Sequence, residues 1–113
     1  MDAVTLSRYR EIIESILTEY TKIPYAYGEI QTEAIFDRDR DRYLLMNTGW
    51  DLGQRVHWCL VHVDLIDGKF WIQRDGTEHG IATELVDAGV PKEKIVLAFK
   101  PLEMRRYTEY ALV

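Results

Sequence analysis

The dipeptide Asp67-Gly68 is the sequence feature that most restricts how this chain can fold. It separates two runs of alternating apolar and polar residues, Arg55 to Ile66 and Lys69 to Arg74. An Asp-Gly pair in this setting favours a two-residue turn, because both residues tolerate the positive φ angles that such a turn requires. The sequence therefore predicts an antiparallel β-hairpin in the middle of the chain.

Periodic apolar patterns predict further elements on both sides of this hairpin. Apolar residues spaced three and four apart indicate a helix from Val4 to Tyr20. Strands are expected at Ile30 to Asp37 and Arg42 to Trp50, a second helix at Glu78 to Ala88, and a short strand at Ile95 to Phe99. The expected fold class is α+β: an N-terminal helix, a four-stranded antiparallel meander, a second helix and a short C-terminal strand. The helices should gather mainly on one sheet face.

The composition narrows the class of protein. A length of 113 residues with 47% hydrophobic and 29% charged residues predicts a single globular domain spanning residues 1–113. A net charge of −5 disfavours nucleic-acid binding by the isolated chain. Cys59 stands alone, so no intrachain disulfide forms and a reducing compartment is expected. No signal peptide or membrane span is visible, and we expect a cytoplasmic protein.

Alternating charges fill the segment from Asp37 to Arg42. Three arginines would suit phosphate groups, but the three aspartates between them cancel the field. We interpret the segment as an exposed hairpin connection. If an assembled complex contacts DNA, Arg38, Arg40 and Arg42 are the residues to test.

Side chains alternate across a strand, so the strand from Arg55 to Ile66 should have two different faces. The face expected to form the core is aliphatic and comprises His57, Cys59, Val61, Val63 and Leu65. The other face is aromatic and polar and comprises Val56, Trp58, Leu60, His62 and Asp64. Across the turn, Asp64 should lie opposite Trp71 and His62 opposite Gln73.

These positions predict one aromatic surface lined by Trp58, Leu60, His62, Trp71 and Gln73. Exposed aromatic patches with polar neighbours are typical of sites that bind a partner protein. We expect this surface to bind a partner or another copy of the chain. The alternative is that the C-terminal segment folds back and covers it.

A second cluster, Asp75, Thr77, Glu78 and His79, lies where a strand changes into a helix. Asp75 and Glu78 have the D-x-x-E spacing of a helix capping box, and both acids suit the positive end of the helix dipole. Two carboxylates and a histidine could also perform acid–base chemistry. Capping is the favoured interpretation, and a small enzyme or ligand-binding site at this turn is the alternative.

The histidines and the cysteine do not form a convincing metal or catalytic set. His57 and His62 are five residues apart on one strand, so they should point to opposite faces unless a bulge intervenes. His57 and Cys59 share a face, but a lone thiol in a strand usually packs as a small hydrophobic group. We expect no metal, no cofactor and no catalytic residue, and therefore no enzymatic activity.

Three stretches of the chain resemble the XisI family: KIPYAYGEI, a Gly-Trp pair, and WIQRDGTEHGIATELVDAGVPKEKIVLAF. The likeness covers essentially the whole chain. Its most specific parts are the turn Ile23-Pro24-Tyr25 and the block from Asp75-Gly76-Thr77-Glu78 to Pro91. No single motif in it is catalytic.

The resemblance implies a regulatory accessory protein. XisI proteins are described as excision controlling factors of the fdxN element in cyanobacteria, which is removed during heterocyst development. A separate recombinase cuts and joins the DNA, and the family is paired with an XisH-like partner. These implications come from the resemblance alone, and neither the sign of the regulation nor the oligomeric state follows from it.

Overall fold

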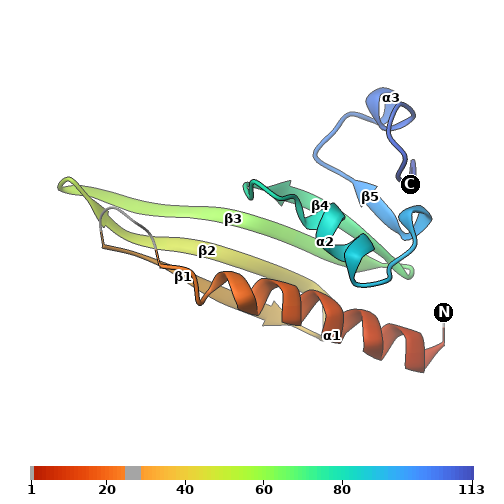
Figure 1. Ribbon diagram of the computed structural model, residues 1–113, viewed down its shortest axis with the longest axis horizontal. Helices are drawn as coiled ribbons and strands as arrows, with labels where there is room; N and C mark the ends of the chain where they lie inside the picture. Colours follow the sequence, from red (N-terminus) through yellow and green to blue (C-terminus); the bar gives the residue numbers. More distant parts are fainter. Residues whose placement is uncertain (1, 25–28) are drawn as a thin grey trace.

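The computed structural model describes residues 2–24 and 29–113, so Tyr25 of the Ile23-Pro24-Tyr25 turn lies outside the described residues. The described residues form one five-stranded sheet with three α-helices and a short 3-10 helix (Figure 1). The strands are β1 (Glu29–Asp37), β2 (Arg42–Asp51), β3 (Gln54–Ile66), β4 (Lys69–Asp75) and β5 (Ile95–Leu97). The helices are α1 (Ala3–Tyr20), α2 (Ile81–Asp87), η1 (Lys92–Lys94) and α3 (Leu102–Arg105).

The sheet order is β1-β2-β3-β4-β5, and the first four strands form the expected antiparallel meander. Asp67 and Gly68 both have positive φ, and Ile66 pairs with Lys69, so the predicted two-residue turn is confirmed. β5 lies parallel to β4, because the α2 crossover carries the chain back to the start of that strand. The α+β fold class is confirmed.

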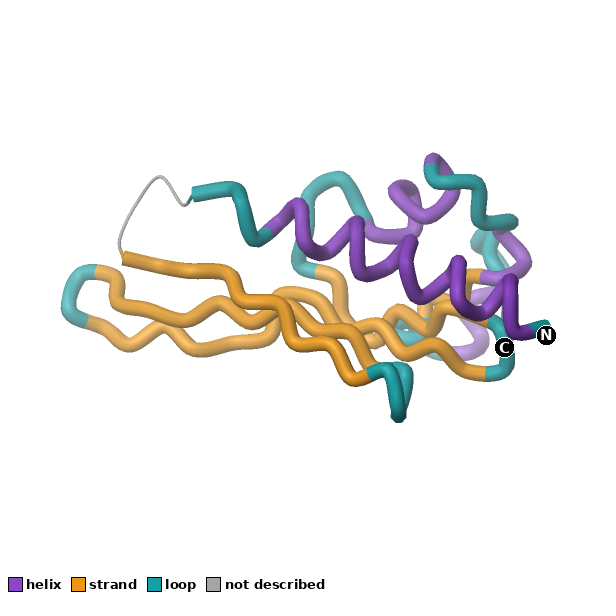
Figure 2. Tube along the Cα trace, turned by 90° about the horizontal axis from the view of Figure 1, so that it is seen from below, coloured by secondary structure: helices purple, strands orange, loops and turns teal. Residues whose placement is uncertain are grey.

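Asp2 caps the N-terminus of helix α1, and its side chain accepts a hydrogen bond from the backbone amide of Thr5 at 2.8 Å. Ile13 and Leu17 on its apolar stripe are fully buried against the sheet. Figure 2 shows α1 lying along one side of the sheet, while the hairpin of β2 and β3 extends beyond the end of the helix. In the described part of the chain, no helix is long and apolar enough to cross a membrane.

Two register shifts determine which side chains share a face. Leu45 pairs with Val61 and Met46 with Cys59, so Leu60 is an extra, bulged residue in β3. Between β3 and β4 the extra residue is Gln73, because Val63 pairs with Ile72 and His62 with Arg74. The prediction that Asp64 lies opposite Trp71 is confirmed, and the pairing of His62 with Gln73 is wrong.

The bulge at Leu60 corrects the predicted faces of β3. Residues that pair directly share a face, so Val61, Val63 and Leu65 lie on the face covered by α1 and α2, which we call the helix face. Trp58 pairs with the buried Asn47 and lies on that face too. His57 and Cys59 instead lie on the opposite side, the open face. The residues of the open face on β2, β3 and β4 include Leu44, Met46, Thr48, His57, Cys59, His62, Asp64 and Trp71.

Helix α2 starts three residues later than the sequence predicts, at Ile81 instead of Glu78. Gly80 has a φ of 92°, which is incompatible with a right-handed helix, so the preceding residues form a loop. Its C-terminus follows the prediction, since Gly89 has positive φ. The amide of Val90 donates to the carbonyl of Leu85 at 3.0 Å, which completes a Schellman motif.

The segment after β5 returns to the edge of the sheet. Phe99, expected in the last strand, follows β5, which ends at Leu97. Ala111 forms a parallel bridge with Val96, and the guanidinium of Arg105 lies 5.7 Å from the centre of the Trp71 ring. The C-terminal segment therefore covers part of the open face at β4 and β5, as the alternative interpretation expected, and leaves the part on β1, β2 and β3 uncovered by described residues.

Candidate functional site

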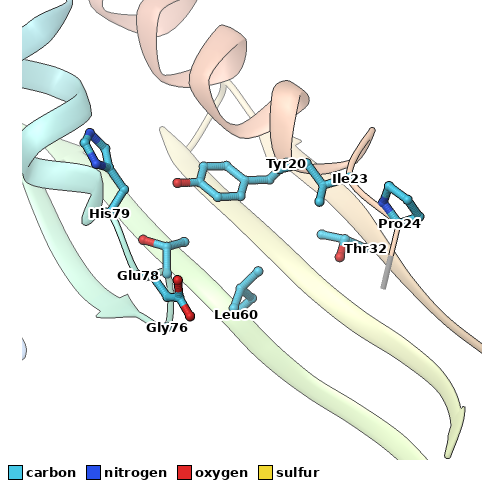
Figure 3. A pocket seen from close by; sticks show the side chains of 9 residues that line it. Tyr20, Ile23, Pro24, Thr32, Leu60, Gly76, Glu78 and His79 are labelled. Atoms are coloured by element: carbon cyan, nitrogen blue, oxygen red, sulfur yellow. The ribbon is translucent and has the colours of Figure 1, made fainter. Parts of the chain in front are cut away.

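A groove on the helix face is the most distinctive cavity among the described residues. It has a volume of about 470 Å³ and lies between the end of α1, strand β3 and the turn before α2 (Figure 3). Its size falls within the range of small-ligand pockets. The groove is lined by Tyr20, Ile23, Pro24, Thr32, Leu60, Gly76, Thr77, Glu78 and His79.

The groove forms where it does because Gly76 lies directly against the bulge of β3. The Gly76 amide donates to the carbonyl of Leu60 at 2.8 Å. A β-carbon at this glycine would lie only 3.0 Å from Leu60 Cδ1 and 3.5 Å from an atom of the Trp58 ring. The close approach brings the turn before α2 against β3. Trp58 lies next to Gly76 at the edge of the groove, outside the residues that line it, with 40% of its surface exposed.

Asp75 holds this turn in place. One of its carboxylate oxygens accepts from the backbone amide of Thr77 at 2.9 Å and from its hydroxyl at 2.6 Å. The other accepts from the amide of Ile81 at 2.7 Å, at the first turn of α2. Thr77 Oγ1 in turn accepts from the amide of Gly80 at 3.2 Å. Both carboxylate oxygens of Asp75 are therefore engaged in structural hydrogen bonds.

The other two members of the predicted turn cluster are at the surface. Glu78 is exposed, and within residues 2–24 and 29–113 it makes no hydrogen bond or ion pair, so it does not complete a capping box with Asp75. His79 Nε2 lies 3.6 Å from a carboxylate oxygen of Asp87. Asp75 and Thr77 therefore stabilise the turn, while Glu78 and His79 lie at the rim of the groove (Figure 3).

Tyr20 forms one wall of the groove and ties α1 to α2. Its hydroxyl donates to Glu84 Oε2. Burial, together with this hydrogen bond, raises the pKa of Tyr20 to about 12. The phenol therefore stays protonated at neutral pH, and it acts as a hydrogen-bond donor and not as a base.

The five residues of the predicted aromatic surface divide between the two faces. Trp58 and Leu60 lie on the helix face as a result of the bulge, where Leu60 lines the groove and Trp58 lies next to Gly76. His62, Trp71 and Gln73 lie together on the open face, around the buried Asp64. His62 Nε2 is 2.7 Å and Gln73 Nε2 is 3.3 Å from the Asp64 carboxylate. Arg42 lies 4.0 Å from the same carboxylate.

Cys59 has the surroundings of a packed thiol. Its sulfur is 3.2 Å from the carbonyl of Val61, to which the thiol donates. Burial raises the pKa of the thiol, and the nearby Arg74 offsets that only in part. A raised pKa reduces the thiolate population, so the geometry disfavours a nucleophilic role.

His57 and His62 do share a face, because the bulge lies between them. In residues 2–24 and 29–113, however, no three His, Cys, Asp or Glu side chains converge to hold a metal ion.

The arginines between β1 and β2 are paired with acids. Arg38 makes a bidentate pair with Glu14 on α1, at 2.7 and 2.8 Å, and Arg40 lies 3.1 Å from Asp37. The segment is a hairpin turn, as its charge pattern predicts. These pairs reduce the positive field that a phosphate would meet.

Sequence reasoning missed several residues that shape the two surfaces. Tyr20 and Glu84 are 64 positions apart, and no local pattern indicates their hydrogen bond. The sequence places Asp64 on an aromatic face, but no local pattern indicates that it is the centre of a polar cluster. Leu44 and Met46 alternate with the buried Tyr43 and Leu45, so the alternation of side chains across a strand places them on the open face.

Comparisons with known proteins agree on one family. The family model described as "XisI protein" matches residues 1–112. A crystal structure of an XisI-like protein from Anabaena variabilis ATCC 29413 is 36% identical, with a TM-score of 0.87, and the match covers 96% of this chain and 99% of that chain. None of the curated proteins matches the sequence.

A second solved structure carries a functional name. The fdxN element excision controlling factor XisI from Anabaena variabilis ATCC 29413 is 32% identical, with a TM-score of 0.82. The match covers 96% of this chain and 99% of that chain, so the likeness extends over nearly the whole of both. The family match and both structures lead to one conclusion: this chain belongs to the XisI family.

Proposed function

We propose that this protein controls the excision of a DNA element as a regulatory accessory factor. The observation that carries the proposal is its end-to-end similarity to a protein named as the fdxN element excision controlling factor. In this proposal the chain acts in the cytoplasm on programmed DNA rearrangement during heterocyst development. A separate recombinase performs the cutting and joining.

The proposed mode of action is binding to an XisH-like partner at the groove on the helix face. Trp58 at the border of the groove supplies the kind of exposed aromatic anchor that dominates binding energy in protein interfaces. Glu78 and His79 supply a polar rim. A partner side chain entering the groove would contact Leu60 at its base.

The proposal assigns no covalent chemistry to the chain. Both carboxylate oxygens of Asp75 accept structural hydrogen bonds, and the pKa of the Cys59 thiol is raised by burial. Tyr20 is kept protonated beside Glu84. Arg38 and Arg40 are paired with acids, which also supports an indirect role in DNA excision. The protein would thus regulate by occupying a surface of its partner.

Co-expression with an XisH-like protein, followed by affinity capture, tests the proposal. Wild-type chain should capture the partner, and the Trp58→Glu variant should lose it. Phe99→Glu is the matched control, because Phe99 is also an exposed aromatic residue but follows β5, away from the groove. Equal capture by wild type and Trp58→Glu, or no complex at micromolar concentration, would contradict the proposed site or the proposed partner respectively.

The groove also favours a second candidate function, the binding of a small ligand at the turn. Its volume of about 470 Å³ and its mixture of apolar walls with Thr77, Glu78 and His79 fit a small polar metabolite. A thermal-shift screen of small metabolites would detect such a ligand. Binding that is lost in Glu78→Gln, with the melting temperature of the free protein unchanged, would support this function over partner binding.

A further inference from the structure

Near the β2–β3 hairpin, the open face of the sheet carries opposite charges on β1 and β3. Register places residues of β1, β2 and β3 in rows across the sheet. One row is Glu29–Trp50–Arg55, and another, four residues along β1, is Glu33–Met46–Cys59. His57 and His62 flank Cys59 on the same face of β3. In these two rows acids lie on β1, apolar side chains on β2, and Arg55 and Cys59 on β3. The row at the far end of the sheet, Asp37–Arg42–Asp64, has acids on both sides, and these are paired within the chain, Asp37 with Arg40 and Asp64 with His62.

This pattern is its own complement under a two-fold rotation. If a second copy faces the first, and the axis runs along β2 between the two sheets, β1 of each copy lies over β3 of the other. Glu29 of one copy then meets Arg55 of the other, twice per dimer. Contacts in which both copies use the same surface are typical of two-fold dimers. Sheets that pack face to face keep their strands within about 30° of each other, as this axis requires.

The middle of the open face supplies apolar area for such a contact. Trp50 is 52% exposed and Ile35 is 50% exposed, while Leu44 and Met46 lie half-buried between them. The guanidinium of Arg55 lies 5.4 Å from the centre of the Trp50 ring, which holds the positive charge beside the apolar centre. At the row Glu29–Trp50–Arg55, a partner of one uniform charge would be repelled by Glu29 or by Arg55, whereas a second copy is attracted at both positions.

We infer that two copies of this chain associate through the open faces of their sheets, with Glu29 of each copy paired to Arg55 of the other. The C-terminal segment beside Trp71 borders the interface at β4. The groove on the helix face stays free in this dimer. The inference therefore goes beyond the proposed XisH-like interaction, and either one can fail without the other.

A charge-swap experiment tests the inference. The dimer dissociation constant of the full chain is measured by sedimentation equilibrium for wild type, Glu29→Arg, Arg55→Glu and the double variant. Each single change should raise the constant at least about tenfold, because like charges then face each other. The double variant should return to within about threefold of wild type, since the pairs are restored with their signs exchanged.

Matched controls separate the interface from net charge. Glu11→Arg and Arg8→Glu make the same charge changes on exposed positions of α1, on the other side of the molecule. Both should leave the dissociation constant unchanged. Circular dichroism confirms that every variant is folded, so that loss of association is not loss of structure.

A crosslinking experiment tests the position of the axis. Thr48 lies on the open face of β2, next to the proposed axis, so Thr48→Cys in a Cys59→Ser background should form a disulfide-linked dimer under mild oxidation. Thr83→Cys on α2, which is exposed on the helix side, should not.

Four results would overturn the inference. The first is a wild-type chain that stays monomeric at about 100 µM. The second is a dissociation constant that the single charge changes leave unaltered, and the third is a double variant whose dissociation constant stays as high as that of the single variants. The fourth is a dimer in which Thr48→Cys forms no disulfide crosslink. The last result would indicate pairing through the free edge of β1.

Discussion

The carboxylate of Asp75, the last residue of β4, accepts the backbone amide hydrogen of Ile81, the first residue of α2, at 2.7 Å. This single side chain closes the turn that forms one wall of the groove. It also accepts two hydrogen bonds from Thr77. The acid that looks most catalytic in the sequence is thus a structural element of the site.

Replacing Asp75 by Ala should destabilise the protein by about 2 kcal/mol, because an N-terminal amide of α2 and both Thr77 donors lose their acceptor. Urea unfolding followed by circular dichroism measures the change. Glu78→Gln is the control, and it should fall within about 0.5 kcal/mol of wild type because Glu78 is exposed. A larger loss for Glu78→Gln than for Asp75→Ala would show that the turn is held differently.

The pair of Arg10 and Asp41 should make stability depend on pH in the acid range. Arg10 Nε and Nη2 bond to Asp41 at 2.7 and 3.0 Å, and the hydroxyl of Tyr43 donates to the same carboxylate at 2.8 Å. The hydrogen bond from Arg10 lowers the pKa of Asp41, against the opposing effect of burial. In the unfolded chain the Asp41 carboxylate has the higher pKa, about 3.9, so it takes up a proton at a higher pH than it does in the folded protein. The stabilisation is therefore present above that pKa and is lost as the pH falls through the folded pKa.

Asp41→Asn tests this sign. Asn tolerates the positive φ of 52° at this position, so the backbone conformation is kept. Wild type should be more stable than Asp41→Asn at pH 6, and the difference should shrink as the pH falls below about 4. Chemical denaturation at a series of pH values measures it. A difference that stays constant down to pH 2 would contradict the assignment.

Gly49 lies where the sheet leaves no room for a side chain. A β-carbon there would lie 1.9 Å from the carbonyl oxygen of Glu29, and its φ is +150°. Gly49→Ala should destabilise the protein by about 3 kcal/mol, since β1 must move away from β2. Gly53→Ala, at the exposed hairpin tip with nothing within 4 Å of the added carbon, should cost only about 1 kcal/mol. Equal losses in thermal unfolding would rule out the close approach of the two strands.

Cys59 should react slowly with thiol reagents in the folded protein. Burial raises its pKa, which lowers the thiolate fraction at pH 7.5. Leu52→Cys in a Cys59→Ser background places a thiol at the exposed tip of the hairpin and serves as the reference. We expect the Cys59 rate, measured with a maleimide, to be at least about tenfold lower. A Cys59 rate equal to the reference would reopen a nucleophilic role.

The turns of this chain can be predicted from short sequence motifs. Asp67-Gly68 and Gly89 both take the positive φ that their residue types permit, so the central hairpin and the end of α2 are where the pattern places them. The apolar stripe of α1 likewise identifies Ile13 and Leu17 as core residues. In each case one short segment contains all of the information.

The errors arise where one residue changes the relation between distant segments. The bulge at Leu60 carries no glycine or proline to mark it, yet it transfers Trp58 to the helix face and His57 and Cys59 to the open face. The predicted aromatic surface was divided for this reason alone. The delayed start of α2 has a visible cause in Gly80, whose φ of 92° breaks the helix, but the same residue type is also common in loops and caps.

The central claim is that this XisI-family protein acts by binding an XisH-like partner at the groove beside Trp58. Isothermal titration calorimetry of the two purified proteins tests it most directly. The account predicts a dissociation constant in the micromolar range or tighter, weakened at least about tenfold by Trp58→Glu and unchanged by Phe99→Glu. Binding of equal strength by wild type and Trp58→Glu, or no binding by the wild type, would contradict it.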